Sequence, residues 1–146
     1  MKITIAQLNY HIGNFEGNLE KMLLEVDKAI NENSDIICFG ELATCGYPPR
    51  DFLEFDDFIE KSNAAIEELK AHSSKIAIVV GGPSVNPIIE GKDLHNSAFF
   101  LYDNKVQYIH HKSLLPTYDI FDEYRYFEPA FKWQCIEFKG IKLAIT

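Results

Sequence analysis

Residues 35–50 read DIICFGELATCGYPPR, an apolar run that passes into a turn-forming segment. The near-continuous apolar stretch 35–40 predicts a strand buried on both faces, as in a sheet covered by other layers. Glu41 follows this strand, next to a permissive glycine and ahead of a rigid double proline. A carboxylate at the end of a buried strand lies at the rim of a sheet, so Glu41 is a candidate catalytic acid or base. A solvated glutamate that caps a strand is the alternative, and spacing alone leaves both open.

The composition is that of a globular domain. The chain has 146 residues, 47% of them hydrophobic and 13% aromatic, which is enough for one core. Its formal net charge of −8 and the lack of a Lys/Arg cluster argue against a nucleic-acid or anionic-membrane partner. Gln7 and Asn9 interrupt the first apolar run, and no apolar stretch approaches the length of a bilayer span. We therefore expect a cytoplasmic location.

The first part of the chain has the pattern of a β-α-β unit. Residues 2–8 are rich in β-branched side chains and predict a strand. Residues 18–33 carry one apolar stripe at helical spacing, and Asn14 or Asn18 is a suitable cap for that helix. After the strand at 35–40, helical spacing returns from Phe55 to Leu69.

The second part of the chain has the pattern of antiparallel strands. Residues 75–84 predict a buried strand that runs into a turn at Gly81-Gly82-Pro83. Further strands are expected at 97–102 and 105–112, joined by a tight turn at Asp103-Asn104, and at 133–138 and 141–146, joined at Lys139-Gly140. The order predicts an α/β fold with a mixed sheet and helices on one face. An apolar strand at the very end of the sequence is unusual for a whole domain, so we expect residues 1–146 to be part of a larger one.

Lys112 is a second candidate for chemistry, because it ends a predicted strand just before the segment SLLPTYDIFDEYRYFEP (113–129). A lysine held in a partly dry, aromatic pocket acts strongly on a nearby anion, which suits the stabilisation of an oxyanion. Glu123 in the same segment is its candidate counter-ion. The alternative is that both are ordinary solvated surface side chains.

Two strings carry a resemblance to a known family: GELATCGYPPRDFL (40–53) and HHKSLLPTYDIFDEYRYFEP (110–129). They resemble the nitrilase (carbon–nitrogen hydrolase) superfamily, and most closely the amino-terminal glutaminase domain of glutamine-dependent NAD synthetases. The hairpin sequence NSAFFLYDNKVQYIHHK (96–112) adds to the resemblance, which covers most of the chain. It implies an α-β-β-α sandwich, of which residues 1–146 are the N-terminal portion, with the rest of that domain and a synthetase domain absent.

The resemblance also implies roles for individual residues. Glu41 would be the general base, Lys112 the stabiliser of the tetrahedral intermediate, and Glu123 a second carboxylate that orients the lysine. Tyr118 matches a position that lines the glutamine pocket. The nucleophilic cysteine would follow Thr146, so residues 1–146 alone are expected to be inactive. Gly40 and Ala130 depart from the residues common in relatives, without removing a functional group.

The remaining cysteines and histidines are given structural roles. Cys45 is expected to be a small buried thiol, and Cys38 and Cys135 to be packing residues within strands. No metal site is expected, because adjacent histidines on a strand, such as His110 and His111, point to opposite faces.

The partners implied by the resemblance are glutamine, a C-terminal synthetase domain of the same polypeptide, and further copies in a homo-oligomer. No cofactor is expected within these residues, while ATP and magnesium would bind the synthetase domain. Two alternatives stay open at this point. One is a stand-alone nitrilase-superfamily amidase acting on another small amide, and the other is a non-catalytic binding or scaffolding relative.

Overall fold

The computed structural model describes residues 1–146. In it the apolar run at 35–40 contains the middle one of three parallel strands. Strand β2 (Ile36–Cys38) pairs in parallel with β1 (Ile3–Ile5) on one side and with β3 (Ala77–Val85) on the other. Ile36 and Ile37 are buried, as expected for a strand covered on both faces. The predicted β-α-β unit is confirmed.

Two antiparallel strands complete a sheet in the order β1-β2-β3-β4-β5. Strand β4 (Leu94–Tyr102) pairs with β3 and with β5 (Lys105–His111). Asp103 and Asn104 join β4 to β5 with φ angles of 54° and 56°. Two consecutive positive φ angles are the signature of the tight hairpin turn that the Asp-Asn pair predicts.

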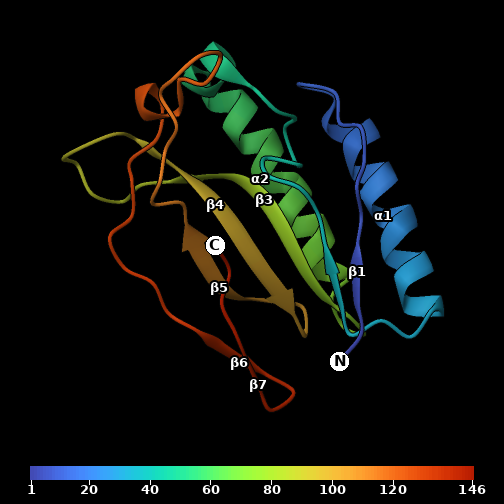
Figure 1. The fold of residues 1–146 in the computed structure, drawn as a ribbon. Helices are drawn as coiled ribbons and strands as arrows, with labels where there is room; N and C mark the ends of the chain where they lie inside the picture. The colour runs from blue at the N-terminus through green and yellow to red at the C-terminus, as the bar shows by residue number, and fades with distance from the viewer.

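Helices α1 (Phe15–Asn31) and α2 (Asp56–Ala71) cover one face of the sheet (Figure 1). Asn14 caps α1, because its side chain accepts a hydrogen bond from the backbone N–H of Gly17. The main core lies between these helices and alternate residues of the strands, including Met22, Val26, Ile66, Leu69, Ile78, Val80, Phe99 and Leu101. Neither helix combines the length and the apolar character needed to cross a membrane. Two short 3₁₀ helices, η1 (Arg50–Glu54) and η2 (Glu123–Arg125), lie in the loops.

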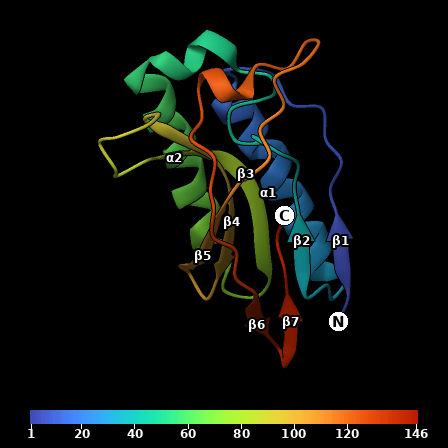
Figure 2. The same ribbon diagram turned by 60° about the vertical axis from the view of Figure 1, so that its left-hand side comes forward.

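The C-terminal segment lies on the other face of the sheet (Figure 2). It forms a separate hairpin of β6 (Ile136–Phe138) and β7 (Ile141–Leu143). Phe138 packs edge-on against Phe100 and Tyr102 of β4, with ring centroids 5.5 and 5.1 Å apart. The layers are therefore helices, main sheet and a second set of strands, in the order that an α-β-β-α sandwich requires.

Two expectations are wrong. Gly81-Gly82-Pro83 is not a turn, because β3 continues through it and pairs with β4 as far as Val85. The pairing of β2 with β3 ends at Val79, so no strand is paired with β3 on that side of Pro83, and a missing N–H is tolerated there. Cys135 is not a packing residue, because it precedes β6 and is exposed.

Gly81 is needed for the close approach of another segment of the chain to β3 rather than for a turn. A Cβ atom at Gly81 would lie 2.5 Å from the backbone N of Leu42 and 2.7 Å from the carbonyl O of Gly40. The segment that carries Glu41 therefore passes directly against β3, and only a residue without a side chain leaves room for it.

Gly81→Ala is expected to lower the free energy of unfolding by about 1–3 kcal/mol, because backbone atoms must move to accommodate the added carbon. Urea denaturation measures this change. Gly40→Ala is the matched control, since its Cβ would come no closer than 3.7 Å to the Tyr10 ring. Equal stability of the two variants would show that the close approach at Gly81 is unimportant.

Candidate active site

Three strand ends bring the candidate residues to one edge of the sheet. Glu41 follows β2, Asn96 lies on β4, and Lys112 directly follows β5. The backbone N–H of Lys112 donates to the carbonyl of Asn96 at 2.8 Å, which continues the β4–β5 ladder by one residue. Side chains alternate along a strand, so Asn96 lies on the opposite side of the sheet from Phe99, which packs in the helix-covered core.

Lys112 bridges two carboxylates. Its Nζ donates to Oε1 of Glu41 at 2.7 Å and to Oε2 of Glu123 at 2.8 Å. Glu123 is almost fully buried, with 7% of its side chain exposed, whereas Glu41 retains 43% and Lys112 29%. The buried carboxylate of Glu123 thus holds the lysine from the interior of the protein, and the carboxylate of Glu41 is the more accessible of the two.

Asn96 joins the same two carboxylates from a second direction. Its Nδ2 donates to Oε1 of Glu41 at 2.6 Å and, more weakly, to Oε2 of Glu123 at 3.4 Å. Asn96 is itself buried, with 3% exposure. A neutral amide therefore fixes Glu41 relative to Glu123 without adding charge.

Tyr47 completes the shell around Glu123, since its hydroxyl donates to Oε1 at 3.0 Å. Burial, followed by the hydrogen bond and charge of Glu123, raises the pKa of Tyr47, which keeps its hydroxyl protonated as a donor. Both oxygens of Glu123 are thereby satisfied, as a buried carboxylate requires.

The lysine is charged at neutral pH. Burial lowers the pKa of Lys112, but hydrogen bonds and charges from Glu123 and Glu41 outweigh burial, so this pKa lies above its ordinary value. An ammonium fixed by two carboxylates suits the stabilisation of a developing anion.

A cavity of about 210 Å³ opens at this charged cluster. Glu41, Asn96 and Lys112 line it together with His110 and the last two residues, Ile145 and Thr146. Phe39, Gly40, Val79, Gly81, Ser97 and Ala98 form the rest of its wall. The cavity therefore brings the carboxylate of Glu41, the ammonium of Lys112 and the C-terminal segment to the same place.

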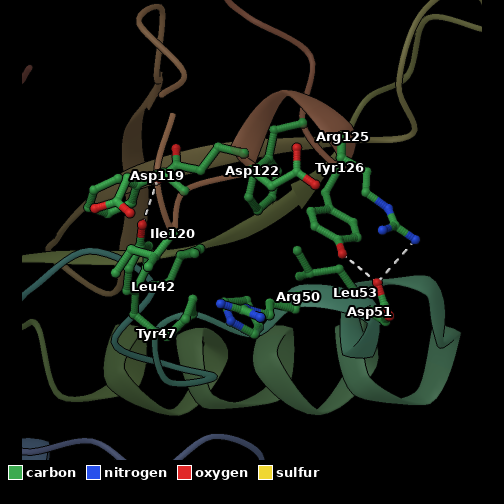
Figure 3. Close-up of a pocket in the computed structure, with 15 residues that line it drawn as sticks. Leu42, Tyr47, Arg50, Asp51, Leu53, Asp119, Ile120, Asp122, Arg125 and Tyr126 are labelled. Carbon is green, nitrogen blue, oxygen red and sulfur yellow. Dashed lines mark hydrogen bonds and ion pairs between the residues drawn. The ribbon is translucent and has the colours of Figure 1, made fainter. Parts of the chain in front are cut away.

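A second cavity, of about 450 Å³, lies on the other side of Glu123 between the loops 47–53 and 119–127 (Figure 3). Figure 3 shows Tyr126 and Arg125 both directed at Asp51, with which they form a hydrogen bond and an ion pair. Tyr118 does not line either cavity. It is 68% exposed and packs edge-on against Phe121, at 5.6 Å between ring centroids.

None of the three cysteines lines the cavity at Glu41. Cys45 is fully buried, and burial raises the pKa of its thiol to about 12, which suppresses the nucleophilic thiolate. Burial also raises the pKa of Cys38. The sequence-based assignment of Cys45 and Cys38 as structural thiols agrees with these environments.

The histidines lie on two faces of β5, as strand alternation predicts. His111 stacks on His95 with ring centroids 4.2 Å apart, and its Nδ1 lies 2.8 Å from the Ser97 hydroxyl. Burial, with smaller contributions from His95 and His110, lowers the pKa of His111 to about 4. His110 faces the cavity instead, and no group of three or more His, Cys, Asp or Glu side chains has metal-binding geometry.

Sequence reasoning named Glu41, Lys112 and Glu123, and the structure brings these three together. Sequence reasoning did not assign Asn96, Tyr47 or His110 to the site. The available signal was their position: Asn96 directly precedes a predicted strand, His110 lies within one, and Tyr47 is next to the double proline.

Comparison with known proteins places this geometry in a family. A model of the carbon-nitrogen hydrolase family matches residues 2–145. The chain belongs to the carbon-nitrogen hydrolase family. Among curated relatives, glutamine-dependent NAD(+) synthetases from Aquifex aeolicus and Synechocystis sp. are 35% and 37% identical over 100% and 99% of this chain. The chain spans only about a quarter of these relatives, 25% and 26% of their lengths.

Solved structures of this family agree in fold. The glutamine-dependent NAD+ synthetase from Acinetobacter baumannii superimposes with a TM-score of 0.87 and 31% identity, covering 96% of this chain and 26% of that one. An amidase from Nesterenkonia sp. gives a TM-score of 0.82 with 17% identity over 99% of this chain and 54% of that one. The amidase likeness shows the fold alone, and this chain has the fold of the N-terminal part of the nitrilase-type sandwich.

Glu123→Gln is expected to lower the pKa of Lys112, because burial then opposes the ammonium with one fewer carboxylate to offset it. An NMR titration of the Lys112 side chain measures this pKa. Since the folded-state pKa is raised, the ion pairs stabilise the fold fully below the ordinary lysine value of about 10.4 and are lost as pH rises through the folded-state pKa.

Tyr47→Phe is the control for that titration, because it removes a neutral donor and leaves both carboxylates in place. It should shift the pKa of Lys112 less than Glu123→Gln does. An unchanged Lys112 pKa in Glu123→Gln would mean that the buried ion pair does not hold the ammonium.

Proposed function

We propose that this chain is the glutaminase portion of a glutamine-dependent NAD synthetase, which hydrolyses the side-chain amide of glutamine and supplies ammonia for amidation of deamido-NAD. The observation that carries the proposal is the bridge from Glu41 through Lys112 to Glu123. It occurs in a chain whose relatives above 30% identity are glutamine-dependent NAD synthetases. Because the chain covers a quarter of those relatives, the proposal concerns a longer protein.

Amide hydrolysis needs a nucleophile, a proton carrier and a stabiliser of the tetrahedral anion. Glu41 takes the proton of a cysteine thiol, and the thiolate attacks the side-chain carbonyl carbon of glutamine. Lys112 holds the negative oxygen that forms, and Glu41 returns its proton to the departing nitrogen as ammonia leaves. A thioester remains, and Glu41 then takes a proton from water, whose attack releases glutamate and restores the thiol. Glu123 keeps the ammonium in place throughout.

The nucleophilic thiol is proposed to come from chain that follows Thr146. Ile145 and Thr146 already line the cavity with Glu41 and Lys112, whereas Cys38, Cys45 and Cys135 do not. Residues 1–146 alone are accordingly expected to release no glutamate from glutamine. Turnover by these residues, or capture of a glutamine-like electrophile at one of the three cysteines, would contradict this placement.

Tyr118 is proposed to contact the substrate as glutamine enters. Its ring is exposed in the same loop as Glu123 and supported by Phe121, so it is available to a ligand that approaches from solvent. We further propose a cytoplasmic homo-oligomer in which ammonia passes to a synthetase domain of the same polypeptide. ATP and magnesium belong to that domain, since residues 1–146 contain no SGG-type phosphate-binding motif.

The two alternatives are less well supported. A stand-alone amidase rests on likeness at 17% identity, which reports the fold and not the substrate. A non-catalytic relative would have no use for a buried carboxylate that holds a lysine against a second carboxylate. Formation of NAD and glutamate from glutamine, ATP and deamido-NAD by the full-length protein supports the proposal, whereas hydrolysis of other small amides without NAD formation supports the amidase.

In the full-length protein, Glu41→Gln and Lys112→Met are each expected to reduce glutamine-driven NAD synthesis by at least about 10²–10³-fold, since each removes a group that acts in the transition state. Ammonia-driven NAD synthesis should stay close to normal, because that reaction bypasses the amide. Glu123→Ala should weaken the glutamine-driven reaction less, by letting the Lys112 ammonium move.

Glu137→Gln and Lys105→Met are matched controls, because both residues are exposed and neither lines the cavity. They should leave both reactions unchanged. Near-normal glutamine-driven turnover in Glu41→Gln and Lys112→Met would disprove the assigned roles.

A further inference from the structure

Asn96 places a buried amide against the two carboxylates of the site. Its Nδ2 donates to Oε1 of Glu41 at 2.6 Å and to Oε2 of Glu123 at 3.4 Å, and only 3% of the residue is exposed. The reaction proposed above uses Glu41, Lys112 and Glu123 and gives Asn96 no part. A buried polar side chain that directs its hydrogen bonds at the proposed base is a candidate for a role of its own.

The hydrogen bonds to the Glu41 carboxylate all end on the same oxygen. Asn96 Nδ2 and Lys112 Nζ donate to Oε1 at 2.6 and 2.7 Å, whereas Oε2 accepts no hydrogen bond from the protein. Rotation about the last side-chain bond of a glutamate exchanges its two oxygens, and this rotation is soft in the absence of partners. Two donors on Oε1 oppose that rotation and leave Oε2 as the oxygen that is free to accept a proton.

The donors come from two neighbouring strands that are bonded to each other. Asn96 lies on β4 and Lys112 directly follows β5, and the backbone N–H of Lys112 donates to the carbonyl of Asn96 at 2.8 Å. Both side chains also donate to Oε2 of Glu123. A lysine has a flexible four-carbon stem, so it holds a carboxylate in place less firmly than the short planar amide of a buried asparagine does. Asn96 is therefore the more rigid of the two donors.

The chemistry of the amide also suits this position. If the amide were turned over, its carbonyl oxygen would face two carboxylates, so the charges around it favour the orientation in which the NH₂ group donates. The amide is neutral and adds no second cation beside Glu41. A second cation would stabilise the charged form of Glu41 further and make it a weaker base.

We propose that Asn96 is a positioning residue for the glutaminase reaction: it holds the Glu41 carboxylate by Oε1 and thereby assigns the proton transfers of the reaction to Oε2. This inference rests on the proposed function. Lys112 has three N–H groups, of which two bond to Glu41 and Glu123, so one remains for the oxyanion. The base and the stabiliser of the anion thus each keep one free position, and Asn96 fixes the first relative to the second.

The test uses the full-length protein with Asn96→Leu, which keeps a similar volume without a donor, and Asn96→Asp, which keeps the shape and replaces the amide by a carboxyl group. Both substitutions should lower the kcat of glutamine-driven NAD synthesis about 10–100-fold, as expected for a misplaced reacting group, and leave the KM for glutamine within about twofold. Ammonia-driven NAD synthesis should remain normal, because it does not use Glu41.

A double-mutant cycle measures whether Asn96 acts through Glu41. In the Glu41→Gln background, Asn96→Leu should lower the remaining glutamine-driven rate by less than about threefold, because the effects of residues that act as one unit do not add. A further loss of about 10-fold or more would mean that Asn96 acts independently of Glu41, which would overturn the inference.

Asn86→Leu is the matched control. Asn86 is also a buried asparagine, and its amide donates to the carbonyl of Lys92 at 2.8 Å, but it lies outside the cavity. It should keep the wild-type kcat. Wild-type kcat in Asn96→Leu and Asn96→Asp would overturn the inference and leave the proposed function standing.

Losses of kcat that only follow the fall in unfolding temperature across all three variants would also overturn the inference, because they indicate a role in packing. Failure of the unsubstituted full-length protein to release glutamate from glutamine would overturn the proposed function, and the inference with it.

Discussion

The whole site depends on holding one ammonium between two carboxylates in a partly buried place. Removing Lys112 and Glu123 from water is unfavourable, and their attraction compensates only if the remaining hydrogen-bonding capacity is also satisfied. Tyr47 and Asn96 do this for Glu123, and Asn96 extends the same network to Glu41. Removing one residue of this network therefore leaves a buried charge partly uncompensated, so the positions of the side chains are tightly constrained.

Backbone contacts, and not side chains alone, hold these residues in position. The N–H of Ala130 donates to the carbonyl of Lys112 at 3.1 Å, which ties the far end of the loop to the end of β5, and the N–H of Glu123 donates to the carbonyl of Pro116 at 3.0 Å within the loop. Gly81 admits the segment of Glu41 against β3. The segment of Glu41, the end of β5 and the loop that carries Glu123 are thereby fixed next to one another by different backbone contacts.

Much of this could be predicted from the sequence where the signal is local. The Asp103-Asn104 turn, the Asn14 cap and the buried strand at β2 each follow from neighbouring residues. Glu41 and Lys112 were identifiable because each follows a strand. The sequence alone does not identify the role of Gly81, because a glycine permits both a turn and a close approach between segments. The choice depends on which segment of the chain packs against it, here the segment that carries Glu41.

The residues missed by the sequence are those whose role lies in another segment. Asn96 is 55 positions from Glu41 and Tyr47 is 76 positions from Glu123, so no local pattern reveals these bonds. His110 illustrates the same limit, since the cavity that it lines also takes parts of its wall from Gly81, Ala98 and Ile145. Cys135 was assigned to a strand that forms only from Ile136 onward.

The most direct test of the account is a crystal structure of the full-length protein after reaction with a chloroketone analogue of glutamine. The account predicts a covalent bond to a cysteine in the cavity beside Glu41, with the ketone oxygen of the adduct about 2.7–3.1 Å from Nζ of Lys112. An adduct on Cys38, Cys45 or Cys135, or one whose oxygen lies away from Lys112, would contradict it.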